Sequence, residues 1–135
     1  MTTALFYLAL TALLTATLWV PYVVALGQTY GPPGPEIYTD PRTATKTEKP
    51  LALWGVRAYR AHLNAVEAFA PFAALVLIAH IVNKETATVA FCAMSFFWLR
   101  LAHAIVMYLG LAYIRTIVFT LGWIAEIVIF WAILS

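Results

Sequence analysis

Four stretches of this chain, residues 4–26, 51–82, 86–109 and 112–134, are each long and apolar enough to cross a lipid bilayer. A transmembrane helix needs about 20 predominantly apolar residues to span the hydrocarbon core. Only a helix satisfies all its backbone polar groups within one segment surrounded by lipid. The sequence therefore predicts an all-α fold, an integral membrane four-helix bundle with four transmembrane helices.

The composition argues against a water-soluble domain. Hydrophobic residues make up 64% of the chain and charged residues only 10%, whereas an ordinary soluble domain has about 25% charged residues. A chain of 135 residues cannot hide so much apolar surface in its own core. We therefore treat residues 1–135 as a single transmembrane domain.

The first apolar stretch is predicted to be a retained helix rather than a cleaved signal peptide. A signal peptide carries Lys or Arg before a short apolar core. Here no Lys or Arg precedes Arg42, and the apolar run is longer than such a core. Pro21 has no backbone N–H, so a bend is expected within this helix.

The connections predict how the helices are ordered and oriented. Residues 27–50 hold five prolines and are predicted to form a long loop, while the connections at residues 83–85 and near Gly110 are short. Short connections make successive helices antiparallel neighbours. Lys and Arg gather on the side of the first and third connections, and cytoplasmic loops carry such an excess. The long loop is therefore predicted to be cytoplasmic, with both termini on the opposite side.

Two features exclude other classes of partner. The net charge of +2 is too small to indicate nucleic-acid binding. The single cysteine, Cys92, excludes an internal disulfide and a site of clustered cysteine ligands, and no metal site is predicted.

Ionisable and amide side chains inside the apolar stretches are the candidate functional residues, because such groups are costly in lipid. They occur in all but the first stretch: Arg57, Arg60, Asn64 and Glu67, then Arg100 and His103, then Arg115 and Glu126. The first four are spaced by three, four and three residues, so they share one helix face. Two readings stay open for this stripe: a binding site, or a polar seam that only holds helices together.

Depth along the helices suggests which groups meet. At 1.5 Å per residue, Glu67 lies roughly 15–18 Å and Arg100 roughly 13 Å below the same membrane surface. A buried pair between them would compensate both charges. Three further cations would then crowd near the cytoplasmic mouth: Arg57, Arg60 and Arg115. Such a cluster favours a ligand with carboxylates or phosphates, or an anionic lipid headgroup.

The residues also match a family pattern. Arg57-Ala58-Tyr59-Arg60-Ala61-His62-Leu63-Asn64-Ala65-Val66-Glu67 resembles the signature of the MAPEG family, the membrane-associated proteins of eicosanoid and glutathione metabolism. Arg100-Leu101-Ala102-His103 and Leu111-Ala112-Tyr113-Ile114-Arg115-Thr116 resemble its third-helix and fourth-helix motifs. The likeness covers nearly the whole chain and is closest to small bacterial members. It implies a bacterial inner (plasma) membrane protein.

The resemblance implies a homotrimer that binds glutathione as a co-substrate near the cytoplasmic side. Arg115 matches the arginine that favours the thiolate, the nucleophilic form of the thiol. The glutathione-binding positions it suggests, with the neighbouring polar residues, are Arg57, Arg60, Asn64, Glu67, Arg100, His103 and Thr116. The expected partners are membrane lipids and a small lipophilic substrate that enters from the bilayer.

The chain departs from the family pattern at several positions, among them Leu63 and a first helix without charge, where some relatives have an arginine. Met107 and Phe119 stand where glutathione-using relatives often have tyrosine. Two functions therefore stay open: a glutathione-dependent transferase or peroxidase, and a non-catalytic lipid-binding or scaffold trimer. A small multidrug exporter fits less well, because such exporters carry a glutamate in the first helix and this chain has none there.

Overall fold

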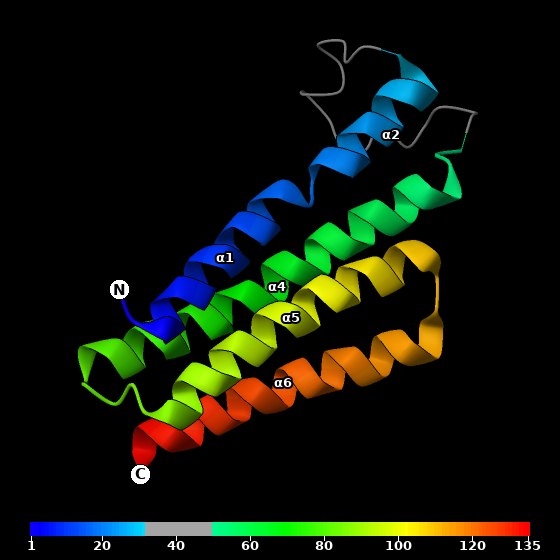
Figure 1. Cartoon of the computed structure of the whole chain (residues 1–135). Helices are drawn as coiled ribbons and strands as arrows, with labels where there is room; N and C mark the ends of the chain where they lie inside the picture. The colour runs from blue at the N-terminus through cyan, green and yellow to red at the C-terminus, as the bar shows by residue number, and fades with distance from the viewer. Residues whose placement is uncertain (32–49) are drawn as a thin grey trace.

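The computed structural model describes residues 1–31 and 50–135, and all regular structure in these residues is helical. The elements are α1 (Thr3–Thr17), α2 (Val20–Tyr30), α4 (Leu53–Ile81), α5 (Ala87–Leu109) and α6 (Ala112–Leu134). With α1 and α2 counted as one span, four helices are long and apolar enough to cross a membrane. The predicted four-helix membrane fold is confirmed. Figure 1 shows α1, α4, α5 and α6 side by side, with both termini at the same end.

The first span is interrupted just before Pro21, as the sequence predicts. Residue 21 has no N–H to donate to the carbonyl of Thr17, and its ring would clash with that carbonyl. α1 accordingly ends at Thr17 and α2 begins at Val20. The Thr17 hydroxyl donates to the carbonyls of Leu13 (3.0 Å) and Leu14 (2.9 Å) in the last turn of α1.

The long loop begins later than predicted. Residues 27–30 were expected in the loop but form the last turn of α2. These residues include no proline, so their backbone can continue the helix. The helix ends at Gly31, whose φ of 86° lies in a region that glycine adopts readily. The remainder of the predicted loop, residues 32–49, lies outside the described residues.

α5 is the central helix and packs against α1, α4 and α6. The rings of Phe72 on α4 and Phe96 on α5 are fully buried and stacked, with centroids 3.9 Å apart. Many of the other buried side chains of these two helices are small. They include Ala58, Ala61 and Ala65 of α4 and Ala93 and Ala104 of α5. Small residues let membrane helices approach closely.

The α5–α6 turn depends on Gly110. Its φ is 77°, and its N–H donates to the carbonyls of Val106 and Met107. A Cβ added there would meet the guanidinium carbon of Arg57 at 2.5 Å. Replacing Gly110 by alanine should therefore destabilise the protein by about 1–2 kcal/mol from the backbone conformation alone. The measurement is the unfolding midpoint in mild detergent.

Gly27 provides a matched control for this substitution. It lies inside α2, and nothing lies within 4 Å of an added Cβ. Alanine is favoured over glycine in a helix interior by about 1 kcal/mol, so Gly27→Ala should leave stability unchanged or raise it. Equal losses for the two substitutions would contradict this account of the turn.

Glu85, in the α4–α5 turn, contacts the N-terminal segment and the end of α4. The Thr2 hydroxyl donates to Glu85 Oε1 at 2.7 Å, and His80 Nδ1 lies 3.2 Å from Glu85 Oε2. Burial alone would raise the pKa of Glu85, but the hydrogen bonds from Thr2 and His80 and the charge of His80 outweigh it. The pKa of Glu85 is therefore held below its ordinary value.

This pKa shift predicts how stability depends on pH. A carboxyl whose pKa is lowered by folding contributes stability above its unfolded-state pKa, and loses it as the pH falls through the folded-state value. We expect the melting temperature to decrease as the pH is lowered below about 4. This decrease should be less steep in Glu85→Gln. Thr3→Val, which leaves the Glu85 contacts intact, should keep the parent's slope. Identical acid limbs in the parent and Glu85→Gln would contradict the prediction.

Candidate functional site

Three cavities follow one another where α4, α5 and α6 meet. We call them the mouth, middle and deep cavities, with volumes of about 290, 280 and 230 Å³. Arg115 lines both the mouth and the middle cavity, and Asn64 and Phe119 line both the middle and the deep cavity. The three therefore form one groove that runs from the α5–α6 turn toward the middle of the helices.

The mouth cavity gathers three arginines: Arg57, Arg60 and Arg115. Arg57 is already engaged, because its Nη1 donates to the carbonyl of Tyr108 at 3.3 Å and so covers the C-terminal end of α5. A cation at this position also interacts favourably with the helix dipole. Arg60 is exposed. The crowding of cations at one mouth, predicted from the sequence, is present in the structure.

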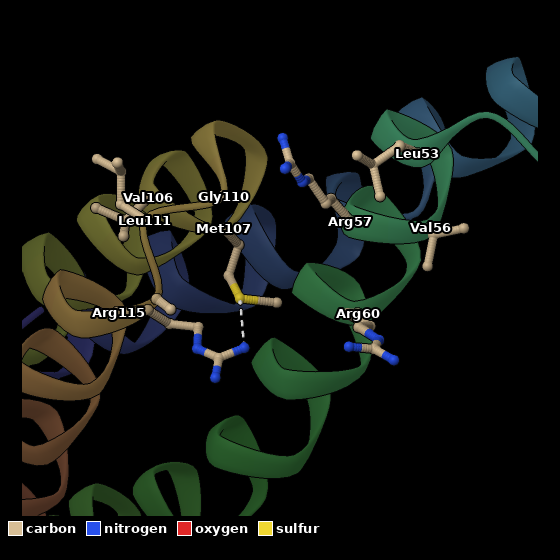
Figure 2. A pocket seen from close by; sticks show the side chains of 10 residues that line it. Leu53, Val56, Arg57, Arg60, Val106, Met107, Gly110, Leu111 and Arg115 are labelled. Carbon is tan, nitrogen blue, oxygen red and sulfur yellow. Dashed lines mark hydrogen bonds between the residues drawn. The ribbon is translucent and has the colours of Figure 1, made fainter.

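Arg115 reaches across the mouth from α6. Figure 2 shows its side chain pointing toward α4, with Met107 of α5 above it. Arg115 Nη1 donates to the Met107 sulfur at 3.8 Å. A thioether is a weak acceptor, and an arginine has five N–H donors. Most of the hydrogen-bonding capacity of Arg115 therefore remains for a ligand.

The middle cavity is lined by Asn64, His103, Arg115, Thr116 and Phe119. His103 is buried, and its ring centroid lies 6.0 Å from that of Phe119. The Thr116 hydroxyl donates to the carbonyl of Ala112 at 3.2 Å, so its oxygen can accept a hydrogen bond but its proton is used. The Asn64 Oδ1 atom is buried and has no hydrogen-bond partner among the described residues.

The deep cavity is arranged around Arg100, whose side chain is only 4% exposed. Its guanidinium carbon lies 5.0 Å from the ring centroid of Phe96 and 5.2 Å from that of Phe119. Rings at such distances attract a cation through their negative faces. Phe119, one of the two positions where tyrosine was expected, therefore supports Arg100 with its ring.

Gly122 makes room for Arg100 on α6. A Cβ added at residue 122 would meet Arg100 Nη2 at 2.6 Å. Glu126 follows one turn later on α6 and is also buried, at 8% exposed. Glu126 is the carboxylate that interacts electrostatically with Arg100.

The ion pair expected from depth between Glu67 and Arg100 is therefore absent from the described residues, and no ion pair joins Arg100 to Glu126 there either. Glu67 and Arg100 both line the deep cavity, but they form no ion pair in the described part of the chain, and Glu67 is exposed. The depth estimate placed both groups correctly near mid-helix. Depth along a helix does not give the rotation of that helix about its own axis. The rotation of α4 leaves the Glu67 side chain exposed, whereas Glu126 of α6 is buried in the same cavity as Arg100.

All eight residues singled out from the sequence line one of the three cavities: Arg57, Arg60, Asn64, Glu67, Arg100, His103, Arg115 and Thr116. Glu126 was named among the ionisable residues of the helices but was given no place in the site, and it lines the deep cavity. Trp123, which also lines this cavity, and Gly122, which lies against Arg100, were not named from the sequence. Spacing already places Glu126 on the helix face of Arg115, eleven residues earlier, and the intervening steps of four, three and four residues add Phe119 and Gly122 to that face.

Four spanning helices with an ionisable groove between them define a multi-pass integral membrane protein. The chain belongs to the MAPEG family, whose sequence model matches residues 4–135. This confirms the resemblance read from the motifs and places the protein among the membrane proteins of eicosanoid and glutathione metabolism. No curated protein and no solved structure matches the chain significantly.

Proposed function

We propose that this protein is a glutathione-dependent transferase or peroxidase that acts on lipophilic substrates from the bilayer. The observation that carries the proposal is the continuous groove. One end has three arginines, and the other end has exposed aromatic residues, Phe119 and Trp123. A polar tripeptide thiol and an apolar acceptor could therefore bind in one groove, each at the end that suits its chemistry.

In this proposal the mouth and middle cavities hold glutathione. Its carboxylates suit the guanidinium groups of Arg60 and Arg115, since such charge-assisted hydrogen bonds are strong. Arg115 is the catalytic residue and stabilises the thiolate. Asn64, His103 and Thr116 supply polar contacts in the middle cavity, and Glu67, which lines the adjoining deep cavity, supplies a further one. Arg57 and Arg100 contribute positive charge at the two ends of the groove.

A thiol-consumption assay and a melting curve test this function. The purified parent protein should conjugate glutathione to a hydrophobic electrophile or reduce a lipid hydroperoxide. Glutathione at a hundredfold over its dissociation constant should stabilise the fold by about 2.7 kcal/mol. The proposal is refuted if the protein consumes no thiol and millimolar glutathione leaves its melting curve unchanged.

The alternative is a non-catalytic lipid-binding or scaffold protein, and one observation favours it. The groove positions expected to carry tyrosine hydroxyls carry Met107 and Phe119, and both contact arginines of this chain. A groove with fewer hydroxyl groups offers fewer contacts to glutathione. Lipid binding with no thiol consumption would support this alternative.

We also propose that the protein assembles as a homotrimer, because Arg60 and Glu67 are exposed on α4 within a membrane-spanning helix. Charged side chains at such positions need protein or water around them rather than lipid. Light scattering in mild detergent should give three chains per particle. A monodisperse monomer would refute this assembly.

The orientation proposed from the charge distribution places both termini on the non-cytoplasmic side of a bacterial inner membrane. Tyr113, at the α5–α6 turn, is 90% exposed and can carry a reporter thiol once Cys92 is replaced by alanine. Tyr113→Cys should react with an impermeant maleimide only from the cytoplasmic side. Asn83→Cys, at the α4–α5 turn, should react only from outside, and the reverse pattern would invert the orientation.

A further inference from the structure

The deep cavity contains buried polar atoms that no described residue satisfies. They are Arg100 Nε and Nη1, Glu126 Oε1 and Asn64 Oδ1. Arg100 and Glu126 are more than nine-tenths buried. Most buried polar side-chain atoms have a hydrogen-bond partner, and an unsatisfied one is costly in an apolar environment. Donors and acceptors without partners thus surround one cavity.

The surroundings of Arg100 restrict where its partner can lie. The rings of Phe96 and Phe119 lie near the guanidinium, and Gly122 lies against Nη2. Guanidinium N–H donors point outward in the plane of the group. No hydrogen bond or ion pair joins Arg100 to Glu126 in the described residues. These N–H groups of Arg100 therefore have no acceptor among the described residues, and Arg100 itself lines the cavity.

The location of the cavity identifies the source of that molecule. Arg100 lies nine residues before Leu109, roughly 13 Å along α5, and Glu126 lies eight residues before Leu134, roughly 12 Å along α6. Both distances fall well inside a hydrocarbon core about 30 Å thick. The cavity is also lined by Pro71 and Trp123, and Trp123 is 53% exposed. A ligand can therefore enter from the lipid.

The charges in the cavity determine the headgroup it accepts. Arg100 and Glu126 balance each other, and a second carboxyl group, Glu67, also lines the cavity. An additional anion would therefore leave a net negative charge in a medium of low dielectric constant, which is costly. An uncharged group that accepts from Arg100 and donates to Glu126 or Asn64 satisfies both without that cost. We propose that the deep cavity binds the uncharged, hydrogen-bond-donating headgroup of a bilayer amphiphile, such as a long-chain alcohol. This site requires no glutathione.

Quenching of Trp123 by brominated amphiphiles tests the proposal. The full-length protein is placed in phosphatidylcholine nanodiscs without glutathione, so failure of the thiol proposal leaves this test readable. The probe is a long-chain alcohol brominated near its hydroxyl. Its matched controls are the methyl ether, which cannot donate, and the carboxylate of the same chain. Subtracting the signal of Trp123→Phe isolates quenching in the cavity.

The alcohol should quench Trp123 at a concentration about tenfold lower than the ether, because only the alcohol can donate a hydrogen bond to a charged acceptor. The carboxylate should bind more weakly than the alcohol. In the doubly neutral variant Arg100→Met with Glu126→Leu, the alcohol and the ether should quench equally. Thr120→Val, on α6 but outside the three cavities, should keep the parent's preference.

Three results would overturn the proposal. Equal quenching by the alcohol and the ether in the parent would mean that the cavity takes up any apolar chain or only water. Tighter binding of the carboxylate would make the cavity an anion site. A preference for the alcohol that survives in the doubly neutral variant would place the headgroup elsewhere.

Discussion

Replacing Glu126 alone by leucine is expected to destabilise the protein by about 3–5 kcal/mol, the typical cost of leaving a buried charge uncompensated. Arg100 would remain at 4% exposure without the carboxylate that interacts with it. The neighbouring rings of Phe96 and Phe119 attract the cation but carry no charge to balance it. Chemical unfolding in mild detergent, followed by far-ultraviolet circular dichroism, measures the loss.

Removing both charges should recover most of that stability. Arg100→Met with Glu126→Leu replaces the charged groups by apolar ones of similar size, and such exchanges are often neutral or stabilising. Glu67→Leu is the matched control, since Glu67 is a carboxylate of the same cavity but exposed. A larger loss for Glu67→Leu than for Glu126→Leu would return the role of partner to Glu67.

The four spans could be predicted because each depends on local composition and length. The bend before Pro21 and the turn at Gly110 also follow from the chemistry of single residues, a missing N–H and a positive φ. The end of α2 was placed too early, because no residue before Gly31 stops that helix. Proline-rich sequence indicates a loop, but not where the preceding helix stops.

The groove was predictable in its residues but not in its pairings. Spacing along one helix shows which side chains share a face, so Arg57, Arg60 and Asn64 were found together. The rotation of one helix against another is set by packing, here by buried residues such as Phe72, Phe96 and Ala104. Because that packing is a tertiary property, the choice of Glu126 over Glu67 could not be made from one sequence.

If the mouth binds glutathione as proposed, replacing Arg115 by methionine should lower the turnover number about 100-fold at neutral pH. Removing one preorganised donor from a developing charge costs about that much in other enzymes. The sulfur of Met107 is the acceptor near Arg115 in the mouth, and a thioether is a weak one. The guanidinium is therefore available to the thiolate of a bound tripeptide.

The pH profile and a matched arginine distinguish catalysis from binding. Without Arg115 less of the bound thiol is ionised at neutral pH, so the variant's activity should recover as the pH rises toward about 8.5, the ordinary pKa of a thiol. Arg60→Met, which removes an exposed mouth arginine, should instead raise KM for glutathione and leave kcat within about threefold. If Arg115→Met raises only KM and shows the parent's pH profile, Arg115 binds the tripeptide but does not activate its sulfur.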